Sequence, residues 1–320
     1  MADPTHGPPS ALPRLVLLGL LWGATFPISR LGVEGGADPF VLVAVAFAIA
    51  AGVTAPAAAL RRSPVPSARR LAESAGVGAL LIGGINLPLF WGERFATGGA
   101  ASIVYATAPI LSLAFVALLR TGERVGPRGG FALVLGLAGV AVLALASGGA
   151  AVTNPWGLVS FGIGALCQGA GAVTLGRLRP RGEGPWGETF QFVGGGGASL
   201  VAVAVLAPAA SLGTSVPTLA AVLYVGVVSM AIGYALFFDL VRRHGAVGAN
   251  QVTFLNPVVA LALGVIVFRE PFAIEEVGGL GLILLALALL HLRGPPTGQP
   301  RPAVAAPTDP ARPGGRRDLS

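Results

Sequence analysis

The chain has 320 residues, of which 54% are hydrophobic and 11% are charged, and its mean hydropathy is +0.78. This composition excludes an ordinary soluble domain. The formal net charge is +7, but the basic residues, all arginine, lie in short loops and a tail and form no contiguous face. That distribution argues against nucleic-acid binding and indicates attraction to anionic lipid headgroups. Cys167 is the single cysteine, which excludes an intrachain disulfide or a thiolate metal cluster.

Ten apolar segments follow one another along the chain, each of roughly 17 to 25 residues and thus about long enough to cross a membrane as a helix. If residue 1 lies in the cytoplasm, every arginine except Arg30, Arg94 and Arg269 falls on the cytoplasmic side, as the positive-inside rule requires. The sequence therefore predicts an all-α integral membrane protein with both termini in the cytoplasm. The expected spans are 13–30, 39–60, 71–95, 98–119, 129–147, 155–178, 187–208, 217–241, 246–268 and 277–292.

The two ends of the chain are expected to be cytoplasmic tails. Residues 1–12 contain Asp3 and His6 and lack the basic region of a cleavable signal peptide, so the first span is expected to stay uncleaved. Residues 294–320 are rich in proline, arginine, alanine and glycine, which is typical of a disordered tail.

The chain contains two copies of one half. Each half, 13–147 and 148–293, has five spans. Because five is odd, the second half enters the membrane from the opposite side. Two inverted five-helix repeats are typical of secondary transporters, in which the halves rock around a midplane site. A shift of 148 residues superposes Ser102 on Asn250, Tyr105 on Thr253 and Pro109 on Pro257.

Four motifs follow one another along the chain: WGATFP at 22–27, GGAAS at 98–102, Pro109 followed by GER at 122–124, and the segment 245–257 followed by REP at 269–271. With these motifs the chain resembles the EamA-type ten-helix transporters of the drug/metabolite transporter superfamily, over about residues 13–292. The resemblance implies export across a bacterial inner membrane. One departure is Ala46 before Phe47, where such proteins often carry an arginine.

Polar side chains within the spans mark the expected site, because such groups are costly in lipid and face the bundle interior or a wet cavity. Ser102, Tyr105 and Pro109 share one helical face by their spacing. We expect this face and its counterpart in the ninth span to confront each other across a central cavity. The candidate substrate-binding residues are Trp22, Thr25, Asn86, Phe90, Ser102, Tyr105, Gln168, Tyr234, Asn250 and Thr253.

Three prolines near mid-span, Pro27, Pro109 and Pro257, are expected to act as hinges. A proline inside a helix removes a backbone donor and kinks the helix, and the freed carbonyls could meet a substrate or water. A simple packing kink is the alternative, and the two interpretations are compatible. Likewise, Trp22 either lines a pocket or packs against small residues, and Gln168 either contacts a ligand or joins helices.

Carboxylates are absent from the centre of every predicted span. Asp239 lies four residues before Arg243, so a surface ion pair is expected. Glu93 lies at the outer mouth, where it could pair with Arg30. Either carboxylate could couple transport to protons. Without a buried arginine or carboxylate at mid-depth, the cavity is expected to take a neutral or zwitterionic solute, either amino-acid-like or drug-like.

Other functions make different demands on the sequence. A nucleotide-sugar or phosphometabolite carrier of the same superfamily would need a basic residue in the cavity. A membrane sensor or assembly partner would usually carry a folded cytoplasmic domain. An enzyme is disfavoured because His6, His244 and His291 are dispersed and have no metal-ligand spacing. No catalytic residue, cofactor or metal is therefore expected, and the expected partners are a small-molecule substrate and lipid, with the chain as a monomer or homodimer.

Overall fold

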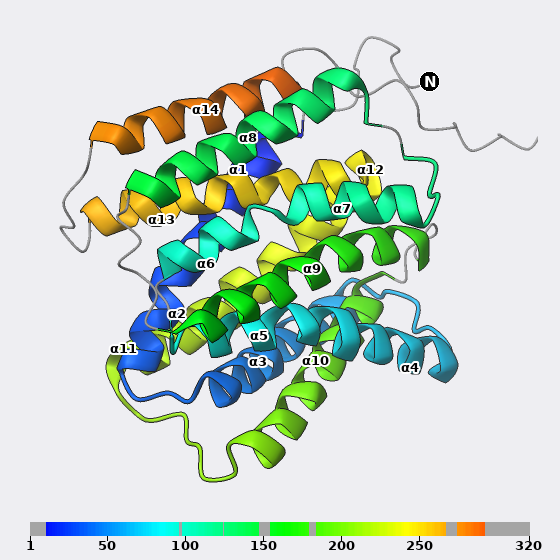
Figure 1. Cartoon of the computed structure of the whole chain (residues 1–320). Helices are drawn as coiled ribbons and strands as arrows, with labels where there is room; N and C mark the ends of the chain where they lie inside the picture. Colours follow the sequence, from blue (N-terminus) through cyan, green and yellow to red (C-terminus); the bar gives the residue numbers. More distant parts are fainter. Residues whose placement is uncertain are drawn as a thin grey trace, which may run out of the picture.

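The computed structural model describes residues 11–95, 98–123, 125–146, 154–178, 184–266 and 274–291, and every regular element among them is helical (Figure 1). Most of both predicted tails, with His6, and the motif at 269–271 lie outside the described residues. In chain order the elements are α1 (Leu12–Gly23), α2 (Thr25–Glu34), α3 (Pro39–Leu60), α4 (Ala68–Val77), η1 (Gly78–Ile82), α5 (Gly83–Gly92), α6 (Gly98–Tyr105), α7 (Ala108–Leu118), α8 (Pro127–Ala146), α9 (Pro155–Leu178), α10 (Gly184–Leu206), α11 (Val216–Leu223), η2 (Tyr224–Gly233), α12 (Tyr234–Asn250), η3 (Gln251–Phe254), α13 (Leu255–Ile266) and α14 (Ile274–His291).

The predicted membrane spans are recovered by length and composition. Seven described helical runs are long and apolar enough to cross a bilayer, and two shorter apolar helices, Pro127–Val142 and Val277–Leu289, accompany them. The longest run, Val216–Leu263, has 48 residues and is interrupted at Gly245, whose φ of 77° and ψ of 173° are not helical. It therefore holds the eighth and ninth spans, and the predicted all-α membrane fold is confirmed.

The two halves share their backbone irregularities as well as their spans. The third span contains the π-helical segment η1 (Gly78–Ile82) and the eighth contains η2 (Tyr224–Gly233). Adding the repeat offset of 148 to 78–82 gives 226–230, which lies inside η2. The break between α6 and α7 at residues 106–107 likewise maps to 254–255, where η3 meets α13. Since π-helical turns are rare and favour functional sites, their recurrence points to the region that the two spans enclose.

Small residues allow the helices of the two halves to approach closely. The backbone of α10 passes α4 so tightly that a Cβ at Gly194 would lie 1.8 Å from the carbonyl oxygen of Ala75. A Cβ at Gly139 of α8 would lie 2.7 Å from the carbonyl oxygen of Gly279 in α14, and Figure 1 shows these two helices side by side at one edge of the bundle. The hydrophobic effect cannot drive helix association within lipid, so these glycines stabilise the bundle by allowing close van der Waals packing.

The loops on the predicted outer face hold the first and eighth spans together. The Asp38 carboxylate caps α3 by accepting from the amide of Phe40 at 2.9 Å, and the amide of Asp38 donates to the carbonyl of Ser211. The Ser215 hydroxyl donates to the carbonyl of Gly35 at 2.8 Å, and that of Thr218 donates to the carbonyl of Gly32 at 3.0 Å. These bonds anchor α2 beside α11 at the outer end of the bundle.

Candidate substrate-binding site

A cavity of about 30 Å³ lies where six spans meet, three from each half. This volume holds a few water molecules and is too small for a metabolite, so the cavity must widen to admit a solute. None of the lining side chains is charged. The lining consists of Trp22, Thr25, Phe26, Ile85, Asn86, Leu89, Tyr105, Gln168, Ser229, Tyr234 and Asn256.

A hydrogen bond between the two halves crosses the cavity. The side-chain amide of Asn86 donates to the hydroxyl of Tyr234 at 2.9 Å and to the carbonyl of Ile82 at 2.9 Å. Asn86 and Tyr234 are 148 residues apart, which equals the repeat offset. Residues that contact their own counterparts in this way lie on the axis relating the repeats. This bond therefore marks the centre of the molecule, next to the two π-helical segments.

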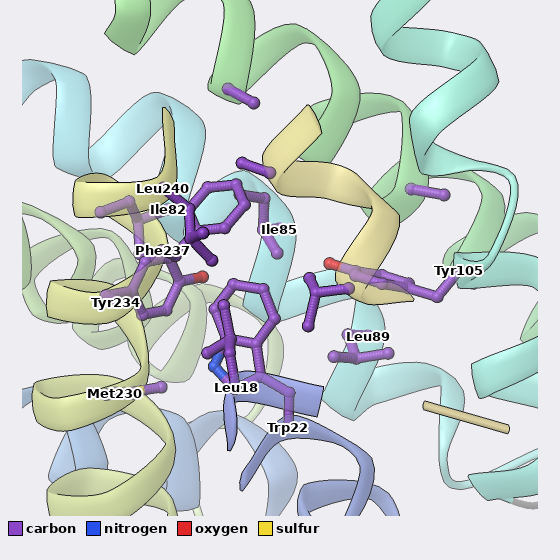
Figure 2. Packing of buried hydrophobic residues seen from close by; sticks show 14 of the residues in the cluster. Leu18, Trp22, Ile82, Ile85, Leu89, Tyr105, Met230, Tyr234, Phe237 and Leu240 are labelled. Atoms are coloured by element: carbon purple, nitrogen blue, oxygen red, sulfur yellow. The ribbon is translucent and has the colours of Figure 1, made fainter. Parts of the chain in front are cut away.

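Aromatic side chains form one wall of the cavity (Figure 2). The Trp22 ring stands edge-on to that of Tyr234 with 5.3 Å between centroids, and it lies 5.1 Å from that of Phe237. Its indole nitrogen donates to the carbonyl of Ser229 at 3.0 Å. A Cβ at position 233 would lie 2.5 Å from that nitrogen, so Gly233 gives the indole its place. These contacts fix Trp22 against the eighth span.

Two polar atoms of the cavity have no hydrogen-bond partner among the described residues: the hydroxyl of Tyr105 and the side-chain oxygen of Asn256. Both residues are buried, at 4% and 1% exposure. An unpaired buried polar atom costs about 1–3 kcal/mol, so buried groups are nearly always bonded. In Figure 2 the hydroxyls of Tyr105 and Tyr234 point towards the same space. The cavity thus offers both a donor and an acceptor with unused bonding capacity.

Behind the cavity, a chain of hydrogen bonds joins the sixth, ninth and fourth spans. The Gln168 amide donates to the Asn250 side-chain oxygen at 2.9 Å, and the Asn250 amide donates to the Ser112 hydroxyl at 2.5 Å. The Ser112 hydroxyl lies 3.4 Å from the carbonyl of Gly169. Only Gln168 of this group lines the cavity, so Asn250 holds it in position from behind.

Six of the ten predicted substrate-binding residues line the cavity, and four are buried beyond it. Thr253, for example, donates to the carbonyl of Asn250 at 2.8 Å in its own helix. The fourth and ninth spans each bring one residue to the cavity, Tyr105 and Asn256. The ninth span contributes Asn256 rather than Asn250 or Thr253, because η3 is wound as a 3₁₀ helix. Its three residues per turn shift the helical phase, which brings Asn256 to the cavity. The lining six are Trp22, Thr25, Asn86, Tyr105, Gln168 and Tyr234, and the other four are Phe90, Ser102, Asn250 and Thr253.

The prediction missed five lining residues: the polar Asn256 and Ser229, and the apolar Phe26, Ile85 and Leu89. A signal for Asn256 was present, because it is an amide immediately before a mid-span proline. Ser229 is a lone hydroxyl in an apolar run, and its hydroxyl is hydrogen-bonded to that of Thr25 at 2.9 Å.

The three predicted hinge prolines share one setting. Pro27, Pro109 and Pro257 each lie in the first turn of a helix, α2, α7 and α13, that follows a break in its span. Proline is tolerated in a first turn, where its missing amide leaves no bond unmade. Movement at these breaks stays a prediction.

At the predicted outer end, Glu93 follows the last residue of α5 and is 7% exposed. Its Oε1 lies 2.7 Å from the Ser29 hydroxyl, and its Oε2 has no partner among the described residues. Arg30, the pairing partner that we expected, instead bonds Glu34 at 2.7 Å. Burial raises the pKa of Glu93 to about 8, while the Ser29 hydrogen bond and the charge of Arg30 act in the opposite direction.

At the predicted cytoplasmic end, Glu123 joins the first half to the ninth span. Its two carboxylate oxygens accept from the amides of Ala246 and Val247, both at 3.1 Å, where Gly245 turns the chain. Burial raises the pKa of Glu123 and the two amide bonds oppose that rise. On the same side Asp239 pairs with Arg243 at 2.8 Å, which is the expected surface ion pair.

Known proteins share both the sequence and the fold of this chain. A sequence model of the EamA-like transporter family matches residues 11–145 and 155–292. The chain is 30% identical to the uncharacterized inner membrane transporter YedA of Escherichia coli (strain K12), over 87% of this chain and 89% of that protein. It is 29% identical to a probable terminal-alkyne amino-acid exporter of Streptantibioticus cattleyicolor, over 83% and 88% of the two chains. A crystal structure with 21% identity superposes with a TM-score of 0.73, covering 88% of this chain and 96% of that one.

Proposed function

Because the chain belongs to the EamA-like transporter family, we propose that it moves a small neutral or zwitterionic solute, amino-acid-like in size and polarity, out of the cell. The observation that carries this proposal is the unpaired Tyr105 hydroxyl and Asn256 oxygen in an uncharged cavity. A hydroxyl can donate and an amide oxygen can accept, so a solute with complementary groups would satisfy both. An amino acid has such groups.

The remaining lining agrees with this solute class. The rings of Trp22 and Tyr234 offer apolar area and a face that attracts an ammonium group. No arginine lines the cavity, which speaks against an anionic sugar nucleotide or phosphometabolite. The similarity to a probable amino-acid exporter supports the same class. Contacts join the halves or spans at both ends of the bundle, between Glu93 and Ser29 and between Glu123 and the start of the ninth span. Alternating access requires the two ends to open in turn, so we expect these contacts to break.

The proposal is tested by solute release from proteoliposomes loaded with a mixture of amino acids and other neutral metabolites and read by mass spectrometry. We expect selective loss of a few solutes. Tyr105→Phe and Asn256→Ala each remove one solute contact and should slow this loss about two- to tenfold. Tyr224→Phe is the matched control, because the Tyr224 hydroxyl bonds the carbonyl of Leu21 and does not line the cavity. Unchanged release by both cavity variants, in folded protein, would refute the proposed site.

A further inference from the structure

Glu93 lies one helical turn outside the cavity. Leu89 and Thr25 line the cavity, and Glu93 and Ser29 follow them by four residues on α5 and α2, which is one turn along each helix. The contact between Ser29 and Glu93 therefore forms the next layer towards the predicted outer face. It joins the first and third spans where they would have to separate for the cavity to open outward.

The hydrogen-bond geometry places a proton on Glu93. The Ser29 hydroxyl lies 2.7 Å from Oε1 of Glu93 and 3.1 Å from the carbonyl oxygen of Phe26. A hydroxyl has one hydrogen to donate, and a carbonyl can only accept. An ionised Glu93 would therefore have to share the single Ser29 hydrogen with Phe26 and would have no second described donor, which favours a protonated carboxyl group. The unpaired Oε2 agrees with this assignment, since an ionised carboxylate needs several donors and is costly to bury without them.

The described positive charges beside Glu93 are each paired with another carboxylate, so they neutralise an ionised Glu93 only in part. On α2, Arg30 is paired with Glu34 at 2.7 Å. Next to Glu93, Arg94 is paired with Asp38 at the start of α3, and its guanidinium lies 5.8 Å from the centre of the Phe40 ring. The neighbouring α6 and the outer half of α9, residues 155–166, contain no charged residue, and Tyr105 is the one titratable group there. Ionisation of Glu93 would thus leave a negative charge between α2 and α5 that is only partly compensated.

We propose that Glu93 is a proton-binding site that controls the outer gate. When protonated, its carboxyl group is neutral and stays buried against the Ser29 hydroxyl, which holds α5 against α2. When the O–H bond breaks, the proton passes to the outer aqueous phase and the carboxylate draws water, which separates the two helices. The site goes beyond the proposed function, because its ligand is the proton and it lies outside the solute cavity. Raising the external pH should therefore favour the outward-open state.

The gate is tested on the full chain in intact bacterial cells, and no solute is added. In a Cys167→Ala background, Leu89→Cys places a thiol on the cavity wall, and a membrane-impermeant maleimide added outside reports opening. Labelling is followed from about pH 6 to pH 9 with Glu93 and with Glu93→Gln, and the ratio of the two rates cancels the titration of the thiol itself. One titrating proton predicts that this ratio rises by up to about tenfold per pH unit until the carboxyl has ionised.

Two further variants decide the outcome. Glu73→Gln removes an exposed carboxylate that pairs with Arg69 at the other end of the third span and should keep the pH dependence of the parent protein. Glu93→Asp keeps a titratable group, so it should retain a pH dependence with a displaced midpoint even if Glu93→Gln folds poorly. A ratio that stays flat with pH in folded protein would overturn the gate. Because no solute is involved, that result would leave the proposed transport function standing.

Discussion

Glu123 and Glu93 are carboxylates near opposite ends of the bundle, Glu123 half-buried and Glu93 buried, and they are bonded to different extents. Both oxygens of Glu123 accept backbone amides at the start of the ninth span. Glu93 has one hydroxyl contact and one oxygen without a partner. A buried polar group with complete bonding stabilises the fold, whereas one with incomplete bonding costs free energy. The roles that we propose, a solute at Tyr105 and Asn256 and a proton at Glu93, fall on groups with incomplete bonding.

For Glu123, whose two oxygens are both hydrogen-bonded, the strongest test is Gly245→Ala. Gly245 has a φ of 77° and a ψ of 173°, which is a region open almost only to glycine. A Cβ there would also lie 2.6 Å from Oε1 of Glu123. We expect a loss of at least about 2 kcal/mol in the free energy of unfolding, measured by thermal unfolding in detergent. Gly162→Ala is the control, because a Cβ there meets nothing within 4 Å. Equal stability of the two variants would show that the Glu123 turn does not support the fold.

A second test of complete hydrogen bonding is Asn250→Ala. It removes both bonds that link Gln168 to Ser112 through Asn250, and it leaves their groups unpaired inside the bundle. We expect a destabilisation of about 1–3 kcal/mol. Thr253→Val is the matched control, because its hydroxyl bonds only within its own helix, and it should cost less than about 1 kcal/mol. If the control proves as costly as Asn250→Ala, the link between the halves contributes nothing to stability.

The sequence predicted the spans and their repeat because both depend on composition and spacing. Six of its candidates line the cavity, since polar and aromatic groups within apolar spans have few other places to lie, and their binding of substrate stays a prediction. These six are Trp22, Thr25, Asn86, Tyr105, Gln168 and Tyr234. It could not place Asn256, because helical spacing assumes one regular helix, and η3 changes the phase of the ninth span.

Neither the π-helical segments nor the proposed protonation of Glu93 could be predicted from the sequence. The π-helical turns of η1 and η2 depend on packing between spans, and no residue pattern in either segment predicts them. The proton on Glu93 depends on the distances from Ser29 to two acceptors, which are properties of two helices in contact. Sequence spacing therefore identified the participants, and the relative placement of the spans determined their roles.

Glu93, the carboxylate with incomplete hydrogen bonding, predicts a pH dependence of stability. The pKa of Glu93 is raised from 4.5 to about 8 in the folded protein, so between these values the native state binds a proton that the unfolded chain has released. The contribution of protonated Glu93 to the free energy of unfolding is full below about pH 4.5 and is lost as the pH rises through about 8. Thermal unfolding between these limits should show stability falling with pH. This fall should diminish in Glu93→Gln and persist in Glu73→Gln, and an undiminished fall in Glu93→Gln would assign it to other groups.

The smallest expected change in stability comes from Tyr105→Phe, and its smallness is the informative result. The Tyr105 hydroxyl has no described partner, so its removal breaks no bond and relieves the cost of burying a polar atom. The free energy of unfolding should stay the same or rise by up to about 1 kcal/mol, as measured by thermal unfolding at one pH. In Tyr234→Phe the Asn86 amide loses its acceptor, so that variant should lose about 1 kcal/mol. A clear loss of stability in Tyr105→Phe would mean that this hydroxyl already has a structural role, and a solute would then have to displace an existing bond to reach it.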